Sequence, residues 1–91
     1  MAERHFLHVA FRFGGKRKTT ELEPIFDKAF DWLRYTPTCW IVWTSRSPGQ
    51  WYQRLKPHLG SDDYVLVVRI DPEQRAGFLP AWAWKWIRKD R

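Results

Sequence analysis

Residues 31–44 read DWLRYTPTCWIVWT, and this stretch decides the fold that the sequence predicts. Pro37 restricts the residue before it to extended backbone, so residues 36–38 favour a turn over a continuing helix. The runs on either side of this turn are rich in aromatic and β-branched side chains, which is typical of antiparallel partner strands. We therefore expect residues 32–35 and 39–44 to form a β-hairpin.

A helix is predicted immediately before this hairpin. Residues 20–23 read TELE, the spacing of a capping box in which a hydroxyl and a carboxylate satisfy backbone amides reciprocally. Apolar residues then recur at helical spacing at Leu22, Ile25, Phe26, Ala29, Phe30 and Leu33. This spacing leaves open a helix that continues through Leu33. We favour a helix that ends near Asp31, because the hairpin then begins there.

Strands are predicted at both ends of the helix–hairpin–helix region. Residues 5–13 (HFLHVAFRF) alternate so that one face holds Leu7, Val9, Phe11 and Phe13. Residues 47–50 (SPGQ) have the pattern of a second helix start, and residues 64–70 (YVLVVRI), mostly apolar on both faces, predict a strand that helices cover on one side. The resulting order is strand, helix, strand, strand, helix, strand. We therefore expect an α+β, ferredoxin-like βαββαβ sandwich, with a four-stranded antiparallel sheet and two helices on one face.

We expect all 91 residues to form one domain, 1–91, with residues 76–91 as a short extension. Residues 76–79 (AGFL) fit a short edge strand, and Pro80 suits the first turn of a helix. Three tryptophans at alternate positions, Trp82, Trp84 and Trp86, also fit a strand. The sequence therefore leaves both helix and strand open for residues 80–91.

The formal net charge is +6, from 16 Lys and Arg against 10 Asp and Glu. This excess favours a polyanionic partner, although it also serves solubility. Seven Trp, six Phe and three Tyr are more aromatic surface than a small core can hide, so some should meet a second subunit or a ligand. The single Cys39 cannot form an internal disulfide, and neither a signal peptide nor a membrane-spanning run is recognisable. We expect a cytoplasmic protein with no membrane partner.

One combination of segments resembles a known group of proteins. It consists of the hairpin at 31–44, LKPHL at 55–59, SDD at 61–63 before an aliphatic strand, and GFLP at 77–80 with Trp82 and Trp86. From Glu21 onward this order resembles the small bacterial SinR-like proteins, relatives of the CRISPR spacer-integration subunit and of the VapD ribonucleases. The resemblance implies a ferredoxin-like homodimer and, from those relatives, RNA or double-stranded nucleic acid as the partner.

Those relatives typically have an aspartate at the end of the first strand, where a metal between two subunits is held. This chain reads VAFRF at residues 9–13, which offers no oxygen ligand for Mg²⁺. His5 and His8 lie three apart on a strand and point to opposite faces, and Asp62–Asp63 fit a turn better than a metal pair. We therefore expect no metal, no small-molecule cofactor and no efficient catalysis.

Candidate contacts to nucleic acid are basic residues on predicted strands and loops. One group follows Gly14–Gly15 and precedes a helix start, where backbone amides favour anions. Arg12 and Arg34 lie on strands, and we expect them to share the sheet face that the helices leave uncovered. The predicted nucleic-acid-binding set is Arg12, Lys16, Arg17, Lys18, Arg34 and Arg46. The predicted subunit-interface set is Trp32, Trp40, Trp43, Trp82 and Trp86.

The function that we expect from the sequence is a homodimer that binds RNA or DNA without efficient catalysis. Two alternatives stay open. The first is a VapD-type endoribonuclease that uses a site not identifiable in the sequence. The second is a protein-interaction module whose aromatic face recruits another protein.

Overall fold

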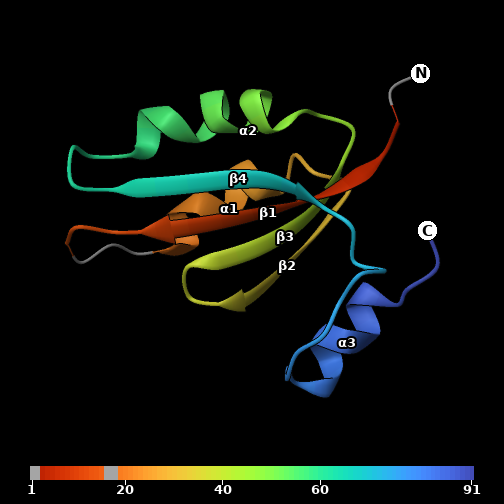
Figure 1. Cartoon of the computed structure of the whole chain (residues 1–91). Helices are drawn as coiled ribbons and strands as arrows, with labels where there is room; N and C mark the ends of the chain where they lie inside the picture. Colours follow the sequence, from red (N-terminus) through yellow and green to blue (C-terminus); the bar gives the residue numbers. More distant parts are fainter. Residues whose placement is uncertain (1–2, 16–18) are drawn as a thin grey trace.

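The computed structural model describes residues 3–15 and 19–91. Its strands are β1 (His5–Arg12), β2 (Asp31–Thr36), β3 (Cys39–Thr44) and β4 (Tyr64–Ile70). Its helices are α1 (Glu23–Phe26), α2 (Pro48–Leu55) and α3 (Ala81–Ile87), with 3-10 turns η1 (Thr19–Leu22) and η2 (Lys56–His58). The strands form one open antiparallel sheet in the order β2–β3–β1–β4 (Figure 1). This confirms the α+β class and the four-stranded antiparallel sheet and is compatible with a ferredoxin-like fold, although the three helices that the structure describes exceed the two of a classic βαββαβ unit.

The hairpin on which the prediction depended is present. β2 and β3 pair with Asp31 opposite Trp43, and the strand register shifts near the turn. The Thr36 hydroxyl accepts the Thr38 backbone N–H over 3.3 Å, which closes the turn around Pro37. The helix that would have continued through Leu33 is therefore excluded, and β2 begins at Asp31 as favoured.

The first helix is much shorter than its apolar spacing predicts. α1 has only one turn after η1, and its N-cap residue Leu22 makes no side-chain cap hydrogen bond. The capping box predicted at residues 20–23 is therefore wrong. The reason is tertiary: the Phe30 backbone N–H donates to the Trp43 carbonyl over 2.9 Å, so the chain has already joined the sheet there. A helical backbone at Phe30 would give up that bond.

The second helix begins as predicted. The Ser47 Oγ accepts the Gln50 backbone N–H over 3.1 Å, and the Gln50 Oε1 accepts the Ser47 N–H over 2.8 Å. Pro48 occupies the first turn, where its missing N–H would have no helical partner. Pro57 lies in η2, the 3-10 turn that follows α2 directly.

The main core lies between the sheet and the pair α1 and α2. Alternate residues of β1 point into it, as predicted: Leu7, Val9 and Phe11. Aromatic rings from three elements stack at its centre. The Phe26 ring lies 4.6 Å from that of Trp40 and 5.8 Å from that of Trp51, and all three side chains are fully buried.

The third helix packs on the opposite face of the sheet. Ala83 of α3 is fully buried against Leu33 of β2 and Ile41 of β3, and Figure 1 shows α3 well apart from α2. This decides the open question of residues 80–91 in favour of a helix. The edge strand suggested at residues 76–79 is wrong, because a turn closed by the Gln74 N–H and the Asp71 carbonyl leads the chain away from β4.

Candidate nucleic-acid interface

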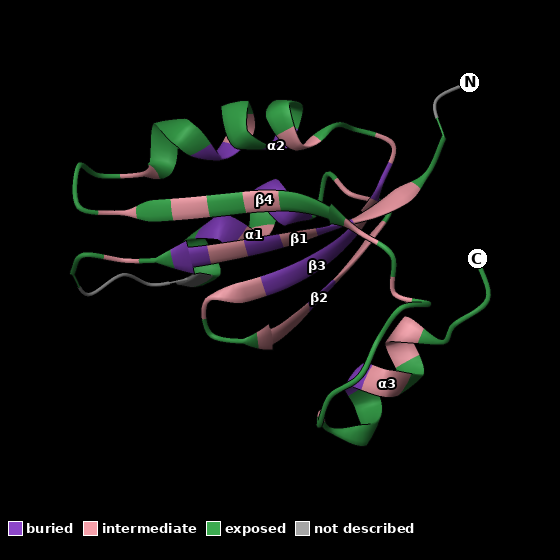
Figure 2. Cartoon of the chain, viewed as in Figure 1, coloured by how far each residue is buried: buried purple, intermediate pink, exposed green. Residues whose placement is uncertain are grey.

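The face of the sheet that carries α3 is only partly covered. At β4 it stays exposed, with Tyr64 at 64%, Leu66 at 60% and Val68 at 36%. We call these three residues the β4 strip. Val65 and Val67, between them, turn to the main core, which explains the alternating burial along β4 in Figure 2. Because β4 lies at the edge of the sheet, the strip is open to a partner.

An arginine borders one end of this strip. Arg12 lies opposite Tyr64 in the β1–β4 register, and its guanidinium carbon is 5.4 Å from the centroid of the Tyr64 ring. Both residues are exposed to solvent. An arginine held over an aromatic ring can contact a phosphate while the ring stacks on a base. The Arg12–Tyr64 pair therefore has the chemistry of a nucleic-acid contact.

The other predicted basic residues do not gather around this pair. Arg34 lies opposite Trp40 in the β2–β3 register, and its guanidinium carbon is 5.4 Å from the Trp40 ring on the helix-covered face. The expectation that Arg12 and Arg34 share a face is therefore wrong. Arg46 is exposed just after β3, where its carbonyl hydrogen-bonds with the His5 ring over 2.8 Å. The remaining predicted contacts, Lys16, Arg17 and Lys18, lie outside the described residues.

The predicted interface tryptophans occupy different environments. Trp40 is fully buried in the main core, so its ring has no surface to offer a partner. Trp32 packs against the same core and donates its indole N–H to Asp27 over 2.9 Å. Trp43 and Trp86 are half-buried on the opposite face, and Trp82 is 54% exposed on α3. For these tryptophans other than Trp40, an interface role stays a prediction.

A polar pair lies on the sheet face that carries α3 and the β4 strip, which we call the open face. His8 Nε2 and the Tyr35 hydroxyl are hydrogen-bonded between β1 and β2. Burial lowers the pKa of His8. Burial raises the pKa of Tyr35 to about 12, and Cys39 contributes to this shift through its charge and through a side-chain hydrogen bond. At neutral pH the pair therefore consists of a neutral imidazole and a protonated phenol, which adds hydrogen-bonding groups but no charge.

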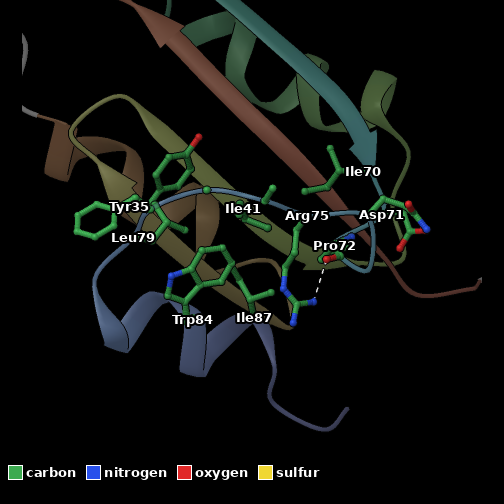
Figure 3. Close-up of a pocket in the computed structure, with 13 residues that line it drawn as sticks. Tyr35, Ile41, Ile70, Asp71, Pro72, Arg75, Leu79, Trp84 and Ile87 are labelled. Carbon is green, nitrogen blue, oxygen red and sulfur yellow. Dashed lines mark hydrogen bonds between the residues drawn. The ribbon is translucent and has the colours of Figure 1, made fainter.

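A pocket of about 420 Å³ adjoins this pair, and the sequence did not reveal it (Figure 3). It lies between the sheet, α3 and the connection from β4 to α3. Most of its walls are apolar, and Tyr35 and Arg75 contribute polar groups. No motif could have indicated this pocket, because its lining residues come from segments between Tyr35 and Ile87 that meet only in the folded chain.

Acidic and metal-ligating side chains give no site in the part of the chain that the structure describes. Within it, no group of three His, Cys, Asp or Glu side chains is placed to hold a metal ion. Asp63 instead connects two loops, since its Oδ1 accepts the Gly14 N–H over 2.9 Å and its Oδ2 accepts the Gly60 N–H over 2.7 Å. This agrees with the turn role expected for Asp62–Asp63. Among the same described residues, no helix has the length and apolarity needed to cross a bilayer.

Comparison with known proteins gives no relative: no family model, no curated protein and no solved structure matches this chain. Function must therefore be inferred from the chemistry of the open sheet face.

Proposed function

We propose that this chain is a ferredoxin-like, nucleic-acid-binding protein that acts as a homodimer and does not cleave its ligand. The observation that carries the proposal is the exposed Arg12–Tyr64 pair at the border of the β4 strip. A guanidinium is always charged and forms several hydrogen bonds to phosphate oxygens, while a tyrosine ring stacks on any base. The net charge of +6 adds an attraction to polyanions that does not depend on sequence.

The β4 strip supports the homodimer. Leu66 and Val68 are exposed aliphatic residues on an edge strand, and such surface suits another protein better than a phosphate backbone. A two-fold contact centred on Leu66 would bring together the same residues of both subunits, as an isologous interface requires. It would leave one Arg12–Tyr64 pair at each end of the apolar contact, so that a nucleic acid could cross both subunits. The resemblance to SinR-like proteins likewise implies a homodimer with a nucleic-acid partner.

Binding is favoured over ribonuclease activity by the residue at the end of β1, which is Arg12. The resemblance places a metal-binding aspartate there, whereas this chain has Arg12 over Tyr64. A guanidinium repels a metal cation and attracts a phosphate, so the position suits a ligand contact. Cleavage of RNA by the purified protein would overturn this part of the proposal and support the VapD-type alternative.

Nucleic-acid binding is tested with labelled RNA and DNA, as duplexes and as single strands, at about 50 and about 200 mM salt. We expect retention without cleavage, weaker at the higher salt concentration. Arg12→Gln should weaken binding several-fold and reduce the slope of log K against log salt by about one. Lys56→Gln is the matched control, since Lys56 is an exposed cation on η2, which follows α2 directly. Equal effects of both variants, or no binding by the wild type, would contradict the proposal.

The homodimer is tested by light scattering over a range of protein concentrations. We expect a dimeric mass for the wild type and a monomeric mass for Leu66→Lys, which places a charge in the centre of the β4 strip. Tyr52→Lys is the control, because Tyr52 is 40% exposed on α2, away from the strip. A wild-type protein that stays monomeric at high concentration would exclude the homodimer but leave nucleic-acid binding intact.

A further inference from the structure

The pocket beside α3 lies between the sheet and that helix, and we call the space between them the slot. Its volume of about 420 Å³ lies within the range of small-molecule sites, about 300–1,000 Å³. Figure 3 shows Ile41 and Ile70 of the sheet on one side and Trp84 and Ile87 of α3 on the other. Trp84 therefore gives the α3 side an aromatic surface, and Ile41 and Ile70 give the sheet side an aliphatic one. A planar ring placed between them would stack on the Trp84 indole and exclude water from both of its faces.

An exposed arginine is among the residues that line this slot. Arg75 is exposed, and its guanidinium carbon lies 6.0 Å from the centroid of the Trp84 ring. Its Nη1 donates to the Pro72 carbonyl over 2.9 Å, the bond drawn in Figure 3, which holds the side chain against the connection from β4 to α3. A guanidinium has five N–H donors, so one bond to a carbonyl leaves several for an anion. The ring slot and the anion contact are thus adjacent.

The pocket also contains an acidic residue, and its position gives the ligand an orientation. Asp71 lies at the end of the pocket away from Trp84 (Figure 3), and its Oδ1 accepts the Glu73 backbone N–H over 3.0 Å. A carboxylate there repels a phosphate and accepts hydrogen bonds from amino groups. The anionic part of a ligand is therefore directed to Arg75 and not to Asp71.

We propose that this pocket holds one unpaired nucleobase, stacked on Trp84, with its phosphate on Arg75. The inference rests on the proposed function and names the ligand class: a nucleic acid with a single-stranded segment or end. A base inside a duplex is stacked on its neighbours and cannot enter a slot, so an unpaired nucleotide is required. The slot lies on the sheet face that holds the β4 strip, because its lining residue Tyr35 is hydrogen-bonded to His8, which pairs with Val68 of the strip.

The test compares a short labelled single strand, a blunt duplex of the same sequence, and adenosine monophosphate alone. We expect Trp84→Leu and Arg75→Gln each to weaken single-strand binding about ten-fold, while duplex binding stays within about two-fold of the wild type. Tyr52→Leu and Arg88→Gln are the matched controls. Tyr52 is an exposed aromatic residue of α2 that does not line the pocket, and Arg88 is an exposed arginine directly after α3.

The outcomes separate the pocket from the proposed function. If single strands and duplexes bind the wild type, and both pocket variants bind like their controls, the nucleobase pocket is wrong and the proposed function stands. If the wild type binds neither, the proposed function fails. If adenosine monophosphate binds as tightly as the single strand, the pocket is a site for free nucleotides and the inference about strands is wrong. Arg75→Gln keeps the test decisive should Trp84→Leu fail to fold, because the Arg75 residue is exposed.

Discussion

Arg91 donates a hydrogen bond to the Asp31 carboxylate over 3.3 Å and so connects the segment after α3 to the first residue of β2. Although it lies near the surface, the Arg91 side chain is only 10% exposed. Its guanidinium carbon is 4.3 Å from the Trp86 ring centroid and 5.2 Å from that of Phe6. It also donates to the Trp86 carbonyl over 3.0 Å. These contacts fix α3 on the open sheet face and thereby form one wall of the pocket.

The first prediction concerns this contact. Arg91→Ala should lower the free energy of unfolding by about 1–2 kcal/mol, because it removes a partly desolvated cation–π contact and a charge-assisted hydrogen bond. Urea unfolding followed by tryptophan fluorescence measures the loss. Lys89→Ala is the control: Lys89 lies 3.9 Å from the same carboxylate but is 63% exposed, so its removal should cost at most a few tenths of a kcal/mol. Similar losses for the two variants would contradict the role given to Arg91.

The second prediction concerns two adjacent glycines. A Cβ at Gly14 would lie 2.3 Å from the Asp62 Cβ and 2.7 Å from the Asp62 carbonyl oxygen. Gly14→Ala must therefore displace the backbone and should cost about 1–3 kcal/mol of stability. At Gly15 a Cβ would meet nothing within 4 Å, so Gly15→Ala should be close to neutral. Thermal unfolding of both variants measures the difference, and a neutral Gly14→Ala would show that this close approach is absent in solution.

The third prediction concerns a buried hydrogen bond in the main core. The Trp51 indole N–H donates to the Thr44 hydroxyl over 3.1 Å, and Thr44 is only 2% exposed. Thr44→Val keeps the shape but removes the acceptor of that N–H and of the Arg46 backbone N–H, which the same hydroxyl accepts over 3.1 Å, and this should cost about 1–3 kcal/mol. Thr20→Val, at an exposed threonine of η1, should change stability by about 0.5 kcal/mol or less. If Trp51→Phe costs as much in the Thr44→Val background as in the wild type, the two side chains are not coupled.

The fourth prediction concerns pH. Burial lowers the pKa of His8 below its ordinary value of 6.5, so the unfolded chain binds a proton there more readily than the folded chain. The contribution of His8 to stability is therefore complete above that value and is lost as the pH falls through the lowered folded-state pKa. His8→Gln should remove this part of the loss. The measurement is urea unfolding of both proteins at about pH 7.5 and about pH 5. The same loss in wild type and variant would exclude His8 as its source.

Features encoded by neighbouring residues could be predicted from the sequence. The β2–β3 hairpin follows from the turn at Pro37 between two β-rich runs, and β1 and β4 follow from short apolar runs. The start of α2 follows from Ser47 and Gln50, whose reciprocal bonds span only three residues. Arg12 could likewise be placed on a strand face by alternation alone. In each case the deciding interactions lie within a few residues along the chain.

What only the tertiary structure decided depends on residues far apart in sequence. The apolar spacing of residues 22–33 predicts a long helix, but pairing of Phe30 with Trp43 limits α1 to one turn. Arg34 lies on the same sheet face as the main core because it is opposite Trp40. The segment 81–87 is a helix on the other face, and the hydrogen bond from Arg91 to Asp31 holds it there. The pocket exists only because that helix docks beside Tyr35 and Ile70. Local sequence sets local backbone preferences, whereas the choice among them follows from the contacts that the folded chain brings together.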